Sequence, residues 1–268
     1  MTTTALARST EVVRRTASGY PWIAIALALA IIGVYALFQV ERFGPPVLLI
    51  AVPLLLGAGL LLAGLYMLQP NEAAILLLFG EDKGTDRTAG LRWANPFFKK
   101  QKISLRARNL ASERLKVNDK RGNPIEIAAA IVWRVRDTSQ ASFDVEDFEE
   151  YVRIQAEAAV RHLASSYAYD EGDDLHAGEI TLRAGQDKVA SSLIRELTER
   201  FDQAGIVVED AKLTHLAYAP EIAQVMLRRQ QAEAIIAARQ KIVHGAVSMV
   251  EMALAELSAK KVVELDDE

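Results

Sequence analysis

Cysteine is absent from the 268 residues of this sequence. Disulfide bonds, thiolate metal ligands, a cysteine nucleophile and S-palmitoylation are therefore all excluded. Histidine is scarce as well, and its spacing shows neither His-Glu-x-x-His nor His-x-His. For His162, which falls on the apolar side of an expected helix, a packed core position is favoured over a metal ligand. The remaining histidines are His176, His215 and His244.

Sequence signatures of enzymes are missing too. The chain has no Gly-x-Ser-x-Gly, no phosphate-binding P-loop and no Gly-x-Gly-x-x-Gly after a strand. The serines at 165–166 and 191–192 have no recognisable general base. The acidic loop at 170–174 lacks the alternating oxygen positions of an EF-hand. We therefore predict that the protein is not an enzyme and has no catalytic, cofactor-binding or metal-binding residues.

An excess of positive charge is also lacking, since the net charge is −4 at pH 7, which argues against bulk binding of nucleic acid. The charges are nonetheless clustered. Residues 92–121 carry ten basic and two acidic side chains, and residues 144–174 carry ten acidic and two basic.

Three interpretations of these clusters stay open. In the first, the clusters are two solvated faces. In the second, the basic segment faces anionic lipid headgroups, which attract Lys and Arg by ~1 kcal/mol each. In the third, the basic face of one subunit meets the acidic face of the next in a head-to-tail contact. The charges expected in that contact are Arg106, Arg108, Glu149 and Glu150.

Two long runs near the N-terminus contain no charged residue, Gly19–Val40 and Phe43–Leu68. About 20 helical residues cross the ~30 Å hydrocarbon core, so each run is long enough to span a membrane. Full spanning is favoured, and a re-entrant second segment broken by its prolines is the alternative. The positive-inside rule places the N-terminus in the cytoplasm, and two crossings return the chain there. The arginines that set this orientation are Arg8, Arg14 and Arg15.

The stretch from Gln69 to Phe98 follows the second run directly. It holds a Pro-Asn-Glu turn, an apolar strand from Ala73 to Phe79, and a Gly-rich loop that ends in Gly-Leu-Arg-Trp and Pro-Phe-Phe. This ordered set, behind a membrane anchor, resembles the opening of the SPFH or band-7 domain of stomatin, prohibitin, flotillin and their prokaryotic relatives. Side chains expected at the membrane surface are Arg92, Trp93, Phe97, Phe98, Lys99, Lys100 and Lys102.

In the rest of the soluble part, the spacing of the apolar side chains changes between the period of a strand and that of a helix. Side chains from Ile125 to Val135 alternate as in a strand with one buried face. Helical spacing begins at Asp144 and returns in a second helix that ends at Gly205. Residues 206–216 are extended again and resemble the strand that closes the family's second subdomain. The prediction is an α+β fold, with a small antiparallel sheet beside two helices and a strand. The second helix presents Leu182, Val189, Leu193, Leu197 and Phe201.

A long, coiled-coil-like helix is predicted over residues 220–263. Apolar side chains repeat along it by three and four, in a 3.5-residue seam that also contains Arg229 and Arg239. At 1.5 Å per residue the helix extends ~60 Å, which the preceding domain is too small to cover. Neighbouring copies of the same helix are its expected partners, and folding back on its own domain is the alternative. The expected interface residues are Ile222, Val225, Ala232, Ile236, Val243, Ala246, Val250, Ala253 and Leu257.

The predicted organisation has six parts. They are a cytoplasmic tail (1–18), a two-helix membrane anchor (19–68), a β-rich SPFH subdomain (69–136), an α/β SPFH subdomain (137–219), the assembly helix (220–263) and an acidic tail (264–268). Relatives that form cages usually continue past this helix into a capping segment. Either the cap is minimal here or the chain continues.

The family resemblance implies a scaffold in the cytoplasmic membrane that assembles into a large ring or cage. Such an assembly would organise a membrane microdomain or enclose other membrane proteins. A regulatory adaptor of a membrane-bound protease is the alternative. The expected partners are copies of the same chain, membrane lipids, anionic ones among them, and a membrane protease or another membrane protein, with no nucleic acid.

Overall fold

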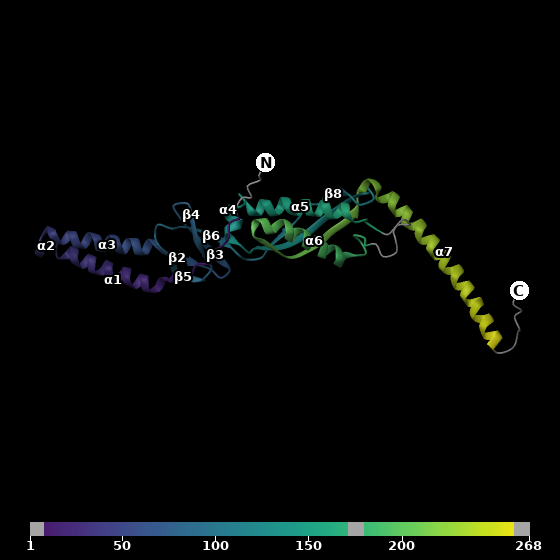
Figure 1. Cartoon of the computed structure of the whole chain (residues 1–268), viewed down its shortest axis with the longest axis horizontal. Helices are drawn as coiled ribbons and strands as arrows, with labels where there is room; N and C mark the ends of the chain where they lie inside the picture. The colour runs from purple at the N-terminus through teal and green to yellow at the C-terminus, as the bar shows by residue number, and fades with distance from the viewer. Residues whose placement is uncertain (1–7, 171–179, 260–268) are drawn as a thin grey trace.

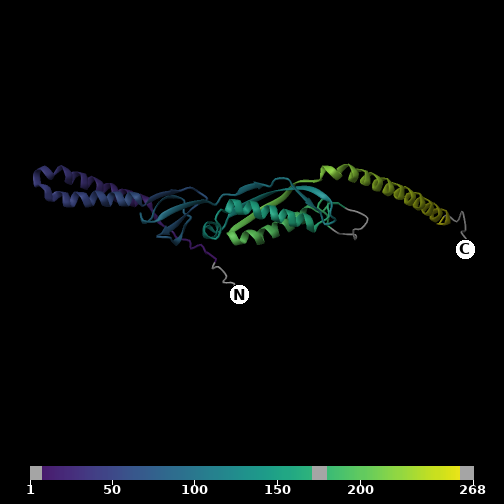
Figure 2. The same cartoon turned by 90° about the horizontal axis from the view of Figure 1, so that it is seen from above.

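The computed structural model describes residues 8–170 and 180–259. The molecule is elongated, with three parts in line (Figure 1). A pair of apolar helices forms one end, a body of sheets and helices lies in the middle, and one long helix projects from the other end. Figure 2 shows the same order of parts from above. The predicted α+β fold, with apolar N-terminal helices and a long C-terminal helix, is confirmed.

Helices α1 (Gly19–Phe38) and α3 (Leu48–Ala63) form the helical pair, joined by α2 (Val40–Phe43) and the 3-10 helix η1 (Pro45–Val47). They pack through small side chains, since Ala26, Ala51 and Ala58 are at most 4% exposed. Pro53 lies inside α3 without ending it. Within the described residues three helices are long and apolar enough to cross a membrane, namely α1, α3 with its preceding turn, and the terminal helix α7 (Pro220–Ala259).

The second apolar run is helical over a shorter length than predicted. The helix α3 ends at Ala63, and β2 (Leu65–Leu68) pairs antiparallel with β5 (Gly90–Trp93). The strand β5 also pairs with β1 (Ala17–Ser18), which directly precedes α1. The chain therefore enters and leaves the helical pair from one three-stranded sheet, and both ends of the pair lie on the same side of any membrane that it enters.

A second three-stranded sheet stands next to the first. Its order is β4-β3-β6, from β3 (Glu72–Leu78), β4 (Glu81–Asp86) and β6 (Lys99–Ser104). The strand predicted over 73–79 is therefore confirmed with a shift of one residue. The Pro-Asn turn before it is closed by the Glu72 carboxylate, which accepts a hydrogen bond from the Gln69 N–H at 2.9 Å.

The largest sheet is built around β9 (Pro124–Val135). Its neighbours are β10 (Ile206–Tyr218) on one side, and β7 (Arg108–Ala111) and β8 (Leu115–Asn118) on the other. The predicted alternation is confirmed, because every second side chain from Ile125 to Val135 is buried. The subdomain boundary predicted at 136/137 falls between β9 and β10, which are paired strands of this sheet.

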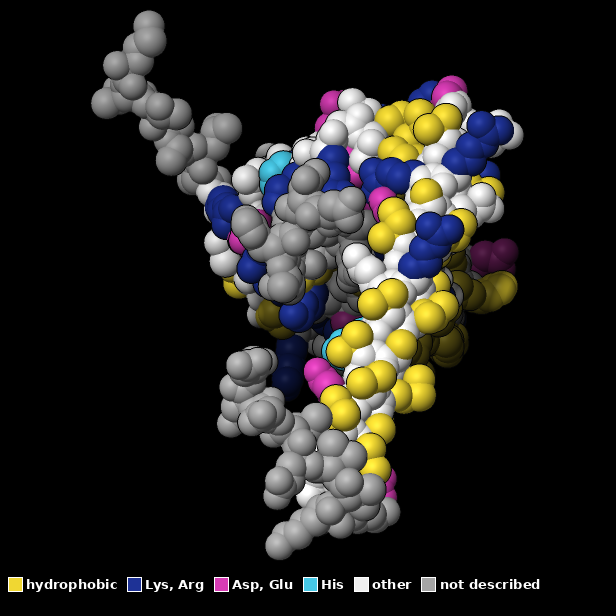
Figure 3. Space-filling model, turned by 90° about the vertical axis from the view of Figure 1, so that its right-hand side faces the viewer, with side chains coloured by type: hydrophobic (Ala, Val, Ile, Leu, Met, Phe, Trp, Pro, Cys, Tyr) yellow, Lys and Arg dark blue, Asp and Glu magenta, His cyan; other side chains and the backbone are white. Residues whose placement is uncertain are grey.

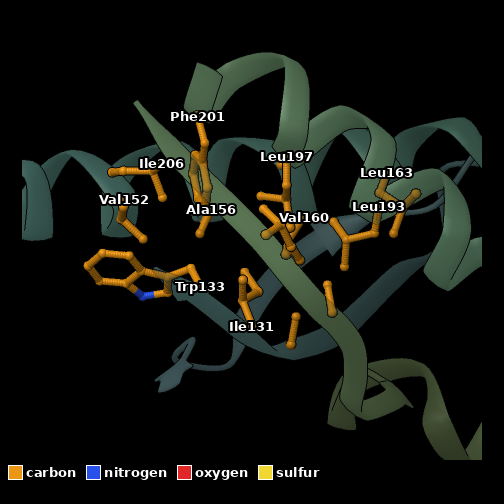
Figure 4. Close-up of a cluster of buried hydrophobic side chains, with 14 of the residues drawn as sticks. Ile131, Trp133, Val152, Ala156, Val160, Leu163, Leu193, Leu197, Phe201 and Ile206 are labelled. Atoms are coloured by element: carbon orange, nitrogen blue, oxygen red, sulfur yellow. The ribbon is translucent and has the colours of Figure 1, made fainter. Parts of the chain in front are cut away.

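Helices α5 (Phe148–Ser166) and α6 (Gln186–Phe201) cover one face of this sheet, and α4 (Thr138–Phe143) and the 3-10 helix η2 (Asp202–Ala204) flank it. Figure 4 shows the side chains of α5 and α6 directed at those of β9 and β10. All five side chains predicted on the second helix are 0% exposed, although Leu182 precedes α6. His162 is not packed in this core as predicted: its side chain is 65% exposed, because it lies on the outer side of α5.

Candidate functional site: membrane junction and terminal helix

The helical pair joins the body through two tryptophans and a lysine. Trp22 of α1 stacks on Trp93 of β5, with the ring centroids 4.0 Å apart. The indole N–H of Trp93 donates to the carbonyl of Leu61 at 2.9 Å. The ammonium of Lys100 donates to the carbonyls of residues 63 and 64, at 3.0 and 3.1 Å. These donors add to the backbone bonds at the C-terminal end of α3, where Leu61 O also accepts the Gly64 N–H and Gly64 O the Ala94 N–H, and so hold α3 to the body.

A buried carboxylate, Asp86, lies beside this junction at 0% exposure. Its Oδ2 accepts hydrogen bonds from the hydroxyls of Tyr66, at 2.7 Å, and Thr16, and lies 3.4 Å from Nε of Arg92. Burial alone would raise the pKa of Asp86, but hydrogen bonds from Thr16, Thr88 and Tyr66 outweigh it and hold the pKa below its ordinary value. Burial raises the pKa of Tyr66, so its hydroxyl remains a donor. The cluster ties the segment before α1 to β2, β4 and β5.

The segment before α1, residues 8–18, lies along the body and is called here the N-terminal strap. The Thr85 N–H of β4 donates to the Val12 carbonyl at 2.9 Å, and the Thr85 carbonyl accepts from the Arg14 N–H at 2.8 Å. Gly84 permits this approach, because a Cβ added there would lie 2.6 Å from the Val12 oxygen. No pattern in the sequence predicts the strap.

Glu11 is the central side chain of the N-terminal strap, and it is only 6% exposed. Its carboxylate accepts paired hydrogen bonds from the guanidinium of Arg87 at 2.6 and 2.5 Å. It also accepts the backbone N–H of Thr138 at the start of α4, at 2.9 Å. The Glu11 N–H donates to Asp137 at 3.3 Å. The strap therefore bridges the membrane-proximal sheet of β4 and the helical layer on the largest sheet.

The residues predicted at the membrane surface separate into three groups. Arg92, Trp93 and Lys100 are directed into the junction and make the contacts described above. Phe98 is half-buried against a small cluster that includes Tyr66. The fully exposed members are Phe97, Lys99 and Lys102.

The basic segment 92–121 does not form one membrane-facing patch. Its first lysines lie at the junction, whereas Lys116 forms an ion pair with Glu221 in the first turn of α7, at the opposite end of the body (Figure 1). The four charges expected in a contact between subunits also have partners in their own chain. The pairs are Arg108 with Glu149, Glu150 with Arg153, and Arg106 with Gln69.

The terminal helix α7 is held to the body at its start and then leaves it. The side-chain amide of Gln230 donates to Asp170 at 3.0 Å, and Arg229 lies 3.8 Å from the same carboxylate. None of the 40 residues of α7 is buried. The alternative in which the helix folds back on its own domain is not what the structure shows, because α7 projects away from the body in both views (Figures 1 and 2).

The predicted seam of α7 is uncovered in the single chain. In Figure 3, hydrophobic side chains follow one another along the side of α7 that faces the viewer. A second apolar row, which was not predicted, runs seven residues apart through Ile235, Ile242 and Met249, at 55%, 71% and 63% exposure. Ile222, near the start of α7, is half-buried, and the other large seam side chains are 39–66% exposed. They are Val225, Ile236, Val243, Val250 and Leu257.

No catalytic group of residues is evident in the part of the chain that is described. There, no group of three or more His, Asp or Glu side chains could hold a metal ion. Nδ1 of His162 lies 3.0 Å from Glu196, which also pairs with Arg200, and Nε2 of His215 lies 3.7 Å from Glu126. His176 and most of the acidic loop at 170–174 lie outside the described residues.

The sequence profile of the SPFH domain / Band 7 family matches residues 66–246, from β2 into the second half of α7. The chain belongs to the SPFH domain / Band 7 family. It is also similar to Protein HflC of Treponema pallidum (strain Nichols), with 24% identity over 216 residues. That match covers 69% of this chain and 65% of the length of Protein HflC.

In this SPFH protein the matched region contains the body from Tyr66 onward and the seam as far as Ala246. The helical pair precedes it. Together with the apolar helices, membership of the family identifies the chain as a membrane protein. The resemblance on which the sequence prediction rested is confirmed.

Proposed function

We propose that this SPFH protein is a membrane-anchored scaffold whose copies assemble through α7 into a large ring or cage on the cytoplasmic membrane. The observation that carries the proposal is a helix of 40 residues with no buried residue and an apolar face exposed along it. Exposed apolar surface of this extent marks an interaction site. The assembly organises a membrane microdomain or encloses other membrane proteins, and its role is architectural and not enzymatic.

Packing between copies of α7 is supported by the size of its apolar face. Burying one Val, Ile or Leu side chain contributes about 1.5–3 kcal/mol. The five exposed large seam residues are 39–66% exposed in the single chain, so burying each contributes roughly half of this amount toward an association cost of about 4–15 kcal/mol. The second row gives each helix another apolar flank, about 100° from the first, because its members lie one residue before Ile236, Val243 and Val250. Two flanks suit a wall, in which every helix has a neighbour on both sides.

The anchor completes the proposal. Helices α1 and α3 both cross the bilayer, and the arginines of the N-terminal strap keep the strap and the body in the cytoplasm. The exposed membrane-surface residues, Phe97, Lys99 and Lys102, then face the inner leaflet beside the helical pair. The continuity of α3 through Pro53 supports two crossings.

The test is the mass of the complex after extraction into a native-lipid polymer disc. Val243→Glu with Val250→Glu places charges in the seam and should reduce the large assembly to single or few chains. The matched control is Ser248→Glu, which lies roughly 140–160° around the helix from both sites and should leave the mass unchanged. A wild-type chain that is extracted as a monomer would overturn the proposal.

The second candidate is a regulatory adaptor of a membrane-bound protease. A wall of α7 helices would enclose any membrane protein inside it and so control the access of substrates, which makes the same architecture suitable for this role. Co-purification of a protease at fixed stoichiometry favours the adaptor. Assemblies with no partner favour the scaffold alone.

A further inference from the structure

Phe79 is the most exposed large apolar side chain of the described residues, at 92%. It forms a two-residue turn with Gly80 between β3 and β4, because Leu78 and Glu81 are the last paired residues of the two strands. Both turn residues have positive φ, +50° for Phe79 and +89° for Gly80. Such hairpin turns favour Asn-Gly, and a bulky aromatic side chain at positive φ is strained. The cost of the positive φ and of the exposed ring at Phe79 would be offset by a contact of this side chain outside the chain.

The pairing of β3 locates this turn relative to the membrane. Ala74 is paired with Asp86, which bonds Tyr66, whereas Leu76 is paired with Lys100, which bonds the end of α3. The strand β3 therefore runs back toward the helical pair. Phe79 is three residues past Leu76, about 10 Å further at the rise of a strand.

The neighbouring loop supports the same placement. Lys99 is paired with Leu77, so the loop that precedes β6 lies next to the end of β3. That loop presents Phe97 at 66% exposure. By this register, two exposed phenylalanines and a lysine lie toward the edge of the body that Lys100 joins to the end of α3. Aromatic rings and lysines together are typical of protein surfaces at the boundary between headgroups and acyl chains.

We propose that the Phe79–Gly80 turn inserts into the bilayer beside the helical pair, with the Phe79 ring at the boundary between headgroups and acyl chains. The occupant is lipid because the register of β3 directs the turn toward the end of α3, which Lys100 holds, and α1 and α3 are apolar enough to cross a membrane. Transfer of the ring from water to lipid offsets the strain of its backbone. The turn and the helical pair together fix the tilt of the body on the membrane. The inference requires α1 and α3 to lie in a bilayer, and it does not depend on assembly through α7.

The absence of cysteine permits a direct test in the full-length chain. Phe79→Cys is labelled with a polarity-sensitive fluorophore and reconstituted into nanodiscs that contain brominated lipids. Ile154→Cys, on the outer side of α5 at 53% exposure, is the matched control. We expect blue-shifted emission, quenching by the brominated lipid and loss of quenching by aqueous iodide for the label at 79. The label at 154 should show the reverse.

Two outcomes overturn the proposal. Iodide quenching at 79 equal to that at 154 would mean that the turn stands in water. Protection from iodide without quenching by brominated lipid would mean that another protein surface, such as a second copy of the chain, covers it. If the labelled variant does not fold, Phe79→Trp keeps an aromatic ring at the turn. Its added fluorescence must then be quenched by the brominated lipid.

Discussion

The junction between the helical pair and the body depends on two carboxylates removed from water. Asp86 and Glu11 are both almost fully buried, and each accepts several hydrogen bonds and faces an arginine. A buried charge is tolerated only with such partners, because desolvation alone costs several kcal/mol. Their partners come from the N-terminal strap, β2, β4, β5 and α4. Each carboxylate therefore joins segments that are distant in the sequence.

Asp86→Asn should lower the free energy of unfolding by about 2–4 kcal/mol, because Arg92 and two hydroxyl donors lose their common anion. The measurement is chemical denaturation of the full chain in nanodiscs. Asp210→Asn removes an exposed carboxylate paired with Lys212 and serves as the control, with an expected change below about 0.5 kcal/mol. Equal effects of the two substitutions would contradict a special role for Asp86.

The same residue predicts a pH dependence. The pKa of Asp86 is held below its ordinary value of 3.8 in the folded chain. Its stabilising contribution is therefore complete above that value and is lost as the pH falls through it toward the folded pKa. The wild-type chain should lose stability below about pH 4, and Asp86→Asn should lose less over the same interval. Thermal unfolding between pH 3 and 7 measures both slopes, and parallel curves would contradict the assignment.

Secondary-structure elements differ in how well the sequence predicts them. The strand β9 and the helices α5 and α6 were predicted because a buried face repeats with a period that only one type of element has. The strand β2 was missed because Leu65–Leu68 continues an apolar run, and such a run does not separate helix from strand. The N-terminal strap is short and polar and has no period. Its pairing with β4 depends on contacts far along the chain, as does the pairing of Arg92 with Asp86.

The candidate site was predicted in part. Proximity to the anchor identified residues 92–102, but it could not show that Arg92, Trp93 and Lys100 are directed inward. Phe79 was predicted only as the last residue of a strand. The signal that distinguishes it, an aromatic residue where a hairpin turn favours asparagine, is evident only once the register of β3 and β4 is known.

Gly84→Ala should displace the N-terminal strap from β4, since the new Cβ would approach the Val12 carbonyl to 2.6 Å and the backbone has a φ of +110°. We expect faster protease cleavage between Arg8 and Arg15 and faster hydrogen exchange at the Thr85 amide. Gly80→Ala is the control, because it also has positive φ but meets no atom within 4 Å. Unchanged cleavage in Gly84→Ala would show that the strap does not rely on this approach.

The whole molecule is organised by the sheet β1-β5-β2, from which the chain departs into the helical pair and to which it returns. In the proposed anchor, the strap and the body therefore lie on one side of the bilayer, and the arginines of the strap favour the cytoplasmic side. The body lies between the helical pair and α7, so the terminal helix begins at the end of the body that is away from the helical pair (Figure 1).

The two crossings can be tested with single cysteines. A cysteine at Glu41→Cys, in the short α2 between the crossings, should react with an impermeant thiol reagent only from outside the cell. The control at Ile154→Cys, on the body, should react only after the cells are opened. If the anchor is re-entrant, the cysteine at position 41 should not react from outside the cell. Reaction of the cysteine at position 154 in intact cells would show that the orientation is opposite to the proposed one.

Because α7 is attached to the body at Asp170, a small rotation of the helix about this contact displaces its far end by a larger distance. From Gln230 to Ala259 the rod measures ~45 Å, so a rotation of ~5° about its pivot moves the far tip by ~4 Å. The hydrogen bond from Gln230 and the charge of Arg229 sit at that pivot, and both use one carboxylate. In the proposed assembly, a small change in the packing around Asp170 would therefore alter the angle between neighbouring α7 helices, and with it the diameter at which a circle of copies closes.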